Sequence, residues 1–133
     1  MRPRPPCDRV LIVEDDADLL EMLADALRLE GVGDTFRAHS LEEARQALAS
    51  GFRPEAVILD LHLPDERGER LLDTLRLDPA YADVRVIALS GDWVALALLR
   101  GAVDRALLKP TSIAGVVRAL HTVCATPSAF RHP

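Results

Sequence analysis

Short apolar runs alternate with helical patterns along almost the whole chain, and this alternation restricts the possible folds more than any other feature. The runs predict short strands, which cover 9–13, 35–38, 56–59, 85–89 and 106–108. Helical spacing of apolar residues predicts helices over 17–30, 40–49, 69–77 and 93–100, and a fifth that starts near residue 112. Strands and helices in regular alternation predict five βα units, with a parallel sheet covered by helices on both faces. The predicted fold class is therefore α/β.

The composition limits the chain to one domain with an acidic surface. With 133 residues, of which 49% are hydrophobic, the chain can bury a single core. Its net charge of -5 argues against a broad basic face for phosphate backbones, so we expect no nucleic-acid partner. The longest apolar runs, roughly six residues, are too short to cross a bilayer, and the first residues do not read as a signal peptide. We therefore expect a soluble protein with no membrane partner.

The two cysteines and the two ends of the chain suggest little structure of their own. Cys7 and Cys124 form neither a metal-spaced cluster nor a disulfide framework, so we expect reduced thiols and a cytoplasmic location. Residues 1–8 and 125–133 lack apolar periodicity, which is typical of a flexible leader and a flexible tail. The folded domain is expected to span 9–124.

Four of the five predicted strands end at polar residues. Glu14 and Asp15 follow the first strand, Asp60 the third, Ser90 the fourth and Lys109 the fifth. In an open parallel sheet the carboxyl ends of the strands form the ligand crevice, so these side chains are expected to share one site. Each one alone could simply mark the point where an apolar strand meets water, but four together make that explanation weak.

The acidic residues of this set favour a hard cation. If the first and third strands are neighbours, Glu14, Asp15 and Asp60 lie close together, and their like charges must raise a pKa or bind a metal through oxygen. Mg²⁺ fits oxygen ligands better than Zn²⁺ does. We expect Asp15 and Asp60 to bind it directly, Glu14 to bind through water, and a backbone carbonyl after the third strand to complete the set. Asp16 is expected to cap the first helix or to face solvent.

Lys109 is the one lysine of the chain, since fifteen of the sixteen basic residues are arginine. A compact ammonium on a flexible stem suits contact with a single phosphoryl or carboxylate oxygen. The position of Lys109 at a strand end therefore points to an anionic ligand, and Ser90 would add a hydroxyl donor on the same side.

The segments VLIVEDD, VILDLHLPDERG, ALSG and LLKP, in this order and at these spacings, resemble the receiver domain of two-component response regulators over about residues 9–124. The resemblance implies a flavodoxin-like (βα)5 fold with strand order 2-1-3-4-5. It also implies that Asp60 is the phosphoacceptor and that Mg²⁺ binds Glu14, Asp15, Asp60 and the main-chain carbonyl of His62. Ser90 matches the switch hydroxyl and Lys109 the lysine that contacts the phosphoryl group.

A receiver domain implies protein partners. Its phosphoryl donor would be a histidine kinase or a histidine phosphotransfer protein, and its state would change binding to a downstream protein that the sequence does not identify. Our leading hypothesis is a stand-alone receiver that catalyses only its own phosphorylation and dephosphorylation. The side chain of His62, at the mouth of the pocket, could tune water access or be an ordinary exposed histidine.

Two departures from the family concern the output face. Ala106 occupies the position where the family usually has Tyr or Phe, and the interval from Ser90 to Lys109 is short, which predicts a trimmed fourth helix. That helix, DWVALALLR, is apolar on nearly all sides, so we expect Trp93, Leu96 or Leu99 to remain exposed. The fourth helix, fifth strand and fifth helix would then form the surface for a partner or a homodimer.

Two other functions compete with phosphoacceptor signalling. The chain could be an interaction module that has lost phosphorylation, which Ala106 favours and the intact acidic residues and Lys109 oppose. It could instead be a metal-dependent phosphatase, but no second acid is positioned to protonate a leaving group.

Overall fold

The structure is a computed structural model of the chain, and it describes residues 7–125. Most of the expected leader and tail lies outside the described residues. Of the leader, Cys7 is buried, and the Asp8 N–H donates to Glu55 Oε1 at 2.8 Å, so these two residues belong to the folded body.

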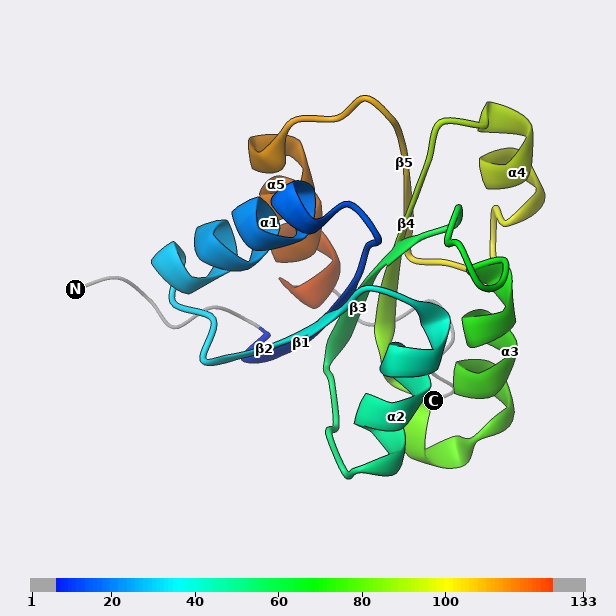
Figure 1. Cartoon of the computed structure of the whole chain (residues 1–133), viewed down its shortest axis with the longest axis horizontal. Coiled ribbons are helices and arrows are strands. Elements are labelled where there is room, and N and C mark those ends of the chain that lie inside the picture. The colour runs from blue at the N-terminus through cyan, green and yellow to red at the C-terminus, as the bar shows by residue number, and fades with distance from the viewer. Residues whose placement is uncertain (1–6, 126–133) are drawn as a thin grey trace.

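A five-stranded parallel sheet forms the centre of the molecule (Figure 1). Its strand order is β2-β1-β3-β4-β5, as predicted. The strands are β1 (Arg9–Val13), β2 (Asp34–Ala38), β3 (Ala56–Asp60), β4 (Arg85–Ser90) and β5 (Arg105–Leu108). β3 and β4 end one residue later than expected, because Asp60 still pairs with Leu89 and Ser90 with Leu108, and β2 and β5 begin one residue earlier. The expected α/β flavodoxin-like fold is confirmed.

Helices cover both faces of the sheet. They are α1 (Ala17–Leu29), α2 (Leu41–Ala49), α3 (Glu69–Leu77), α4 (Trp93–Leu98) and α5 (Ile113–Ala125), with a short 3₁₀ turn, η1 (Pro79–Tyr81), before β4. Figure 1 shows α1 and α5 on one side and α2, α3 and α4 on the other. The central strands β1, β3 and β4 therefore alternate their side chains between two cores: in β1, Leu11 and Val13 face the α2–α4 side, whereas Val10 and Ile12 face α1 and α5.

Local capping groups fix where α1 and α2 begin. The Asp16 carboxylate accepts the N–H groups of Asp18 and Leu19 at the start of α1, which confirms its expected capping role. At α2, Ser40 Oγ accepts the Glu43 N–H at 3.2 Å, while the Glu43 carboxylate accepts the N–H of His39. In a capping box the Glu43 carboxylate would accept the N–H of the N-cap residue Ser40. Here it accepts the N–H of the residue before Ser40 instead.

Cys7 and Cys124 form a disulfide with a Cα–Cα distance of 5.7 Å. The expectation of reduced thiols is therefore wrong. The two residues are separated by 117 positions, and their spacing gave no sign that the start of β1 and the end of α5 lie side by side. Both cysteines pack on the α1–α5 core, which brings the sulfur atoms together.

The fourth helix is short, as expected, but it buries a different set of residues. Trp93 is 69% exposed, in agreement with the sequence, and Leu98 is 80% exposed. Leu96 is buried and Leu99 partly buried against the α2–α4 core, so the expected exposure of these two side chains is wrong. Within residues 7–125 no helix is both long enough and apolar enough to cross a membrane.

Candidate functional site

Asp60 ends the central strand of the sheet. All five residues of β3 are buried, and Asp60 is 3% exposed. Its carboxylate has two partners: Oδ1 accepts the main-chain N–H of His62 at 3.0 Å, and Oδ2 accepts Lys109 Nζ at 3.2 Å. The buried strand β3 thus holds the Asp60 carboxylate at the carboxyl end of the sheet, and hydrogen bonds orient both of its oxygens.

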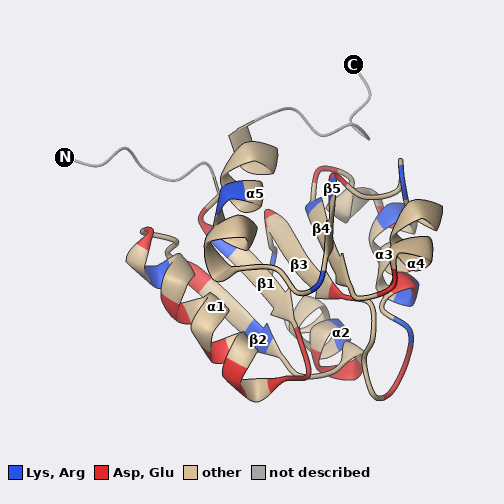
Figure 2. Ribbon diagram, turned by 90° about the horizontal axis from the view of Figure 1, so that it is seen from above, with Lys and Arg blue, Asp and Glu red and all other residues tan. Residues whose placement is uncertain are grey.

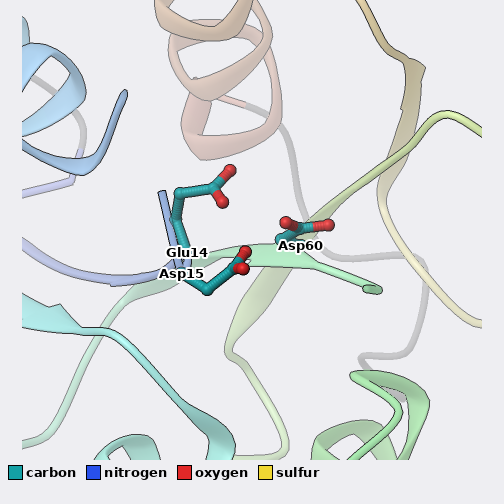
Figure 3. Close-up of side chains that lie close together, drawn as sticks. All are labelled: Glu14, Asp15 and Asp60. Atoms are coloured by element: carbon teal, nitrogen blue, oxygen red, sulfur yellow. The ribbon is translucent and has the colours of Figure 1, made fainter. Parts of the chain in front are cut away.

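Glu14 and Asp15 lie beside Asp60 because β1 and β3 are paired neighbours. Figure 3 shows the three carboxylates directed toward one space, and one oxygen from each lies within 4.8 Å of the others. Glu14 is 1% exposed, whereas Asp15 faces solvent. Glu14 Oε2 accepts the N–H of Asp16 at 3.1 Å, which fixes its carboxylate in the cluster.

Lys109 directly follows β5, the strand at one edge of the sheet, and its side chain extends to this cluster. Its Nζ donates to Glu14 Oε1 at 2.9 Å and to Asp60 Oδ2 at 3.2 Å. Burial lowers the pKa of Lys109, but the contacts with Glu14 and Asp60 outweigh that effect and raise the pKa above its ordinary value. Burial raises the pKa of Glu14 to about 7, although the bond from Lys109 lowers it. The ammonium therefore compensates part of the cluster's negative charge.

The carboxylates of Glu14, Asp15 and Asp60 fit a hard divalent cation. All three offer oxygen, which is the ligand that Mg²⁺ prefers. Lys109 occupies one oxygen each of Glu14 and Asp60, while Asp15 is exposed and directed into the same space. Three acidic groups with one ammonium leave net negative charge at this point, so an added cation is electrostatically favourable.

The side chains of Ser90, His62 and Ala106, which the sequence also singled out, are not part of the acidic cluster. Ser90 is fully buried at the end of β4, and its Oγ accepts the N–H of Asp92 at 3.0 Å. The side chain of His62 is exposed and lines a cavity of about 450 Å³ beside the loop that follows Asp60. Ala106 is exposed on β5 and lines a second cavity of about 510 Å³ against α4.

Two residues of the loop between β3 and α3 were not identified from the sequence. A Cβ on Gly68 would lie 2.5 Å from the carbonyl oxygen of Asp60, so glycine allows the loop to close against the backbone of the strand end. Asp65 accepts the N–H groups of Leu41 and Glu42, the first two residues of α2. Gly68 could have been identified from the sequence, because a glycine before a predicted helix is easily recognised. No sequence feature indicates the contact of Asp65 with α2.

Comparisons with known proteins all indicate the same family. A family model described as the response regulator receiver domain matches residues 10–121. The DNA-binding response regulator MtrA of Mycolicibacterium paratuberculosis is 37% identical over 116 residues, which are 84% of this chain and 50% of that protein. The chain thus spans about half the length of this relative.

Solved structures agree with the sequence matches. A CheY-like response regulator receiver domain from Methylobacillus flagellatus superposes with a TM-score of 0.74 at 30% identity, covering 87% of this chain and 98% of the other. A response regulator from Burkholderia pseudomallei, solved with a phosphorylated aspartic acid, a calcium ion and citrate, gives a TM-score of 0.73 at 26% identity, covering 89% and 69%.

The relatives correct the exclusion of nucleic acid as a partner. The argument used the net charge of this chain, and Figure 2 shows acidic residues on α1, among them the exposed Asp18, Glu21 and Asp25. MtrA is nevertheless a DNA-binding protein, and the match covers half of it. The charge of the matched half does not predict what a whole protein of this kind binds, so the exclusion is wrong.

The fold, the acidic cluster with its lysine, the family model and the relatives lead to one assignment. The chain belongs to the response regulator receiver domain family.

Proposed function

We propose that this chain is a phosphoacceptor signalling domain in which Asp60 receives a phosphoryl group in a Mg²⁺-dependent reaction. The observation that carries the proposal is the position of Lys109 Nζ, 3.2 Å from Asp60 Oδ2 and 2.9 Å from Glu14 Oε1. An ammonium at this point can offset the charge of incoming phosphoryl oxygens, which otherwise repel a carboxylate nucleophile. The donor is a phosphohistidine on a kinase or a phosphotransfer protein.

The transfer joins an oxygen of Asp60 to phosphorus and breaks the phosphorus–nitrogen bond of the donor, whose imidazole nitrogen takes up a proton. The N–H of His62 orients Asp60 through Oδ1. Lys109 contacts the other oxygen and can move its ammonium to the transferred group. Bound by Glu14, Asp15, Asp60 and the main-chain carbonyl of His62, Mg²⁺ would supply further positive charge for the phosphoryl oxygens. The product is an acyl phosphate, a labile anhydride suited to a transient signal.

Ser90 offers a route from the phosphoryl group to α4. Its Oγ accepts the N–H of Asp92, and the carboxylate of Asp92 accepts the N–H groups of Val94 and Ala95 at the start of α4. If the hydroxyl turns to donate to the phosphoryl group, the loop that carries this capping aspartate must shift. Because Ala106 lacks a ring, α4 and its exposed Trp93 and Leu98 are the part of this face that can report the change to a partner protein.

The similar response regulator from Burkholderia pseudomallei supports the proposal because its structure contains a phosphorylated aspartic acid. One observation favours a second candidate, a binding module that acts without phosphorylation. Ala106, at the position where the family usually has an aromatic side chain, lines a cavity of about 510 Å³ against α4. This candidate predicts partner binding that is independent of Asp60.

A labelling experiment tests the proposed function. The protein is incubated with acetyl phosphate and Mg²⁺, and the intact mass is followed over time. We expect one labile phosphoryl adduct in the wild type and none in Asp60→Asn. Lys109→Ala and Asp15→Asn should each slow labelling by about 10²–10³-fold while the circular dichroism spectrum is unchanged. Equal labelling of the wild type and Asp60→Asn would overturn the proposal.

A further inference from the structure

The loop that follows Asp60 is attached to α2 through Asp65. Asp65 Oδ1 accepts the N–H of Leu41 at 3.2 Å, and Oδ2 accepts the N–H of Glu42 at 3.1 Å. These are the first two amides of α2, which have no acceptor within the helix. Burial raises the pKa of Asp65, but the hydrogen bonds from Leu41 and Glu42 bring it below the ordinary value, in keeping with an ionised cap.

A second contact joins the same loop to the same helix. Glu66 forms an ion pair with Arg45 of α2. At its base the loop is held by the strand end, since the His62 N–H donates to Asp60 Oδ1 and the Gly68 N–H donates to the carbonyl of Leu61 at 3.1 Å. The loop is thus fixed at its base by β3 and at its tip by α2.

The start of α2 is also close to the other side of the acidic cluster. The carbonyl of Ala38, three residues before α2, accepts the N–H of Glu14 at 3.0 Å. The next residue, His39, donates its N–H to Glu43 within α2 at 3.0 Å. Asp65 therefore connects the loop that carries His62 with the segment that holds Glu14.

We propose that Asp65 is a positioning residue for phosphoryl transfer: by capping α2 from the β3–α3 loop, it holds His62 and the backbone around Asp60 in the reactive arrangement. This inference rests on the proposed function, but its structural part can be measured without it. Groups that hydrogen-bond to metal ligands commonly change metal affinity by about 10–100-fold when removed, and Asp65 acts one step further out, through the loop that carries His62.

A purely structural role for Asp65 would be that of a helix cap, and Ser40 provides the matched control. Ser40 caps the same end of α2 through the Glu43 N–H, but this hydrogen bond lies within the α2 segment and does not involve the loop after Asp60. Ser40→Ala weakens the helix start and leaves the loop attached. Asp65→Asn replaces one acceptor oxygen with an NH₂ donor, so it removes one of the two hydrogen bonds that join the loop to α2 and weakens the attachment.

The first measurement is amide hydrogen exchange by NMR in the 133-residue chain. In Asp65→Asn the amides of His62 and Gly68 should exchange about tenfold faster than in the wild type, because the attachment of their loop to α2 is weakened. In Ser40→Ala they should keep wild-type rates. The proposal is overturned if His62 and Gly68 keep wild-type rates in Asp65→Asn, or if Ser40→Ala accelerates them equally.

The second measurement is acetyl phosphate labelling across a Mg²⁺ titration. Asp65→Asn should raise the half-saturating Mg²⁺ concentration by about tenfold, whereas Ser40→Ala should stay within about twofold of the wild type. Unchanged Mg²⁺ dependence in Asp65→Asn would overturn the positioning role. If the wild type accepts no phosphoryl group, the proposed function fails, and hydrogen exchange still decides whether Asp65 holds the loop.

Discussion

Glu14 is one of the two buried acids of the cluster, and its ionisation reflects the competition between burial and Lys109. Burial raises its pKa from 4.5 to about 7, against the lowering effect of the Lys109 hydrogen bond. In protein treated with EDTA, NMR of the carboxyl carbon should show Glu14 titrating near 7. Addition of Mg²⁺ should lower that midpoint, because a bound cation favours the carboxylate. A midpoint at 4.5 in EDTA, unchanged by Mg²⁺, would contradict the site.

The raised pKa of Glu14 also predicts how stability depends on pH. Between pH 4.5 and about 7 the folded protein holds a proton on Glu14 that the unfolded chain has released, so stability falls as pH rises through this window. Urea unfolding in EDTA should show this loss for the wild type relative to Glu14→Gln. A difference between the two proteins that does not change with pH would contradict the assignment.

Gly68 allows the β3–α3 loop to close against the end of β3. A Cβ there would lie 2.5 Å from the carbonyl oxygen of Asp60 and 2.9 Å from Cα of Leu61, both of them backbone atoms that cannot rotate away. Gly68→Ala should cost about 1–3 kcal/mol of stability in urea unfolding and should slow labelling. Gly91→Ala is the matched control, because a Cβ at Gly91 has no neighbour within 4 Å. Equal stability of the two variants would contradict the close approach.

Residues at strand ends could be predicted from the sequence, because apolar runs define where each strand stops. Glu14, Asp15, Asp60 and Lys109 were found in this way, and their proximity follows from the parallel sheet. Asp65 could not be found, because its contact with α2 depends on how the β3–α3 loop folds back. Periodicity carries no information on such a contact between loops and helix ends.

At the scale of secondary-structure elements, most helices followed from apolar spacing, and α4 shows the limit of that method. Its six residues are all apolar, so the sequence does not indicate which face packs inward. The structure buries Leu96 and exposes Leu98, since only one side of the helix meets Val103 and the rest of the α2–α4 core.

The orientation of α4 predicts unequal effects of two leucine substitutions. Leu96→Ala should destabilise the protein by about 2–4 kcal/mol, because it removes a buried side chain. Leu98→Ala should change stability by less than about 0.5 kcal/mol, since that side chain is 80% exposed. Urea unfolding of the two variants measures both values, and a reversed order would mean that α4 is rotated about its axis.

At the scale of the whole molecule, the Cys7–Cys124 disulfide closes a loop across 117 positions. A cross-link of that span restricts the unfolded chain and stabilises the fold by about 4–5 kcal/mol in the loop-entropy model. Reductant should therefore lower the Tm of the wild type, while the Cys7→Ser/Cys124→Ser double variant should unfold at the lower temperature with or without reductant. A wild-type Tm that reductant leaves unchanged would contradict this role.

The central claim is that Asp60 carries the phosphoryl group, and chemical trapping tests it most directly. After incubation with acetyl phosphate and Mg²⁺, borohydride reduces an aspartyl phosphate to homoserine, which peptide mass spectrometry locates in the chain. The account predicts homoserine at position 60 and its absence when EDTA replaces Mg²⁺. Homoserine at another aspartate, or at position 60 without a divalent cation, would contradict the account.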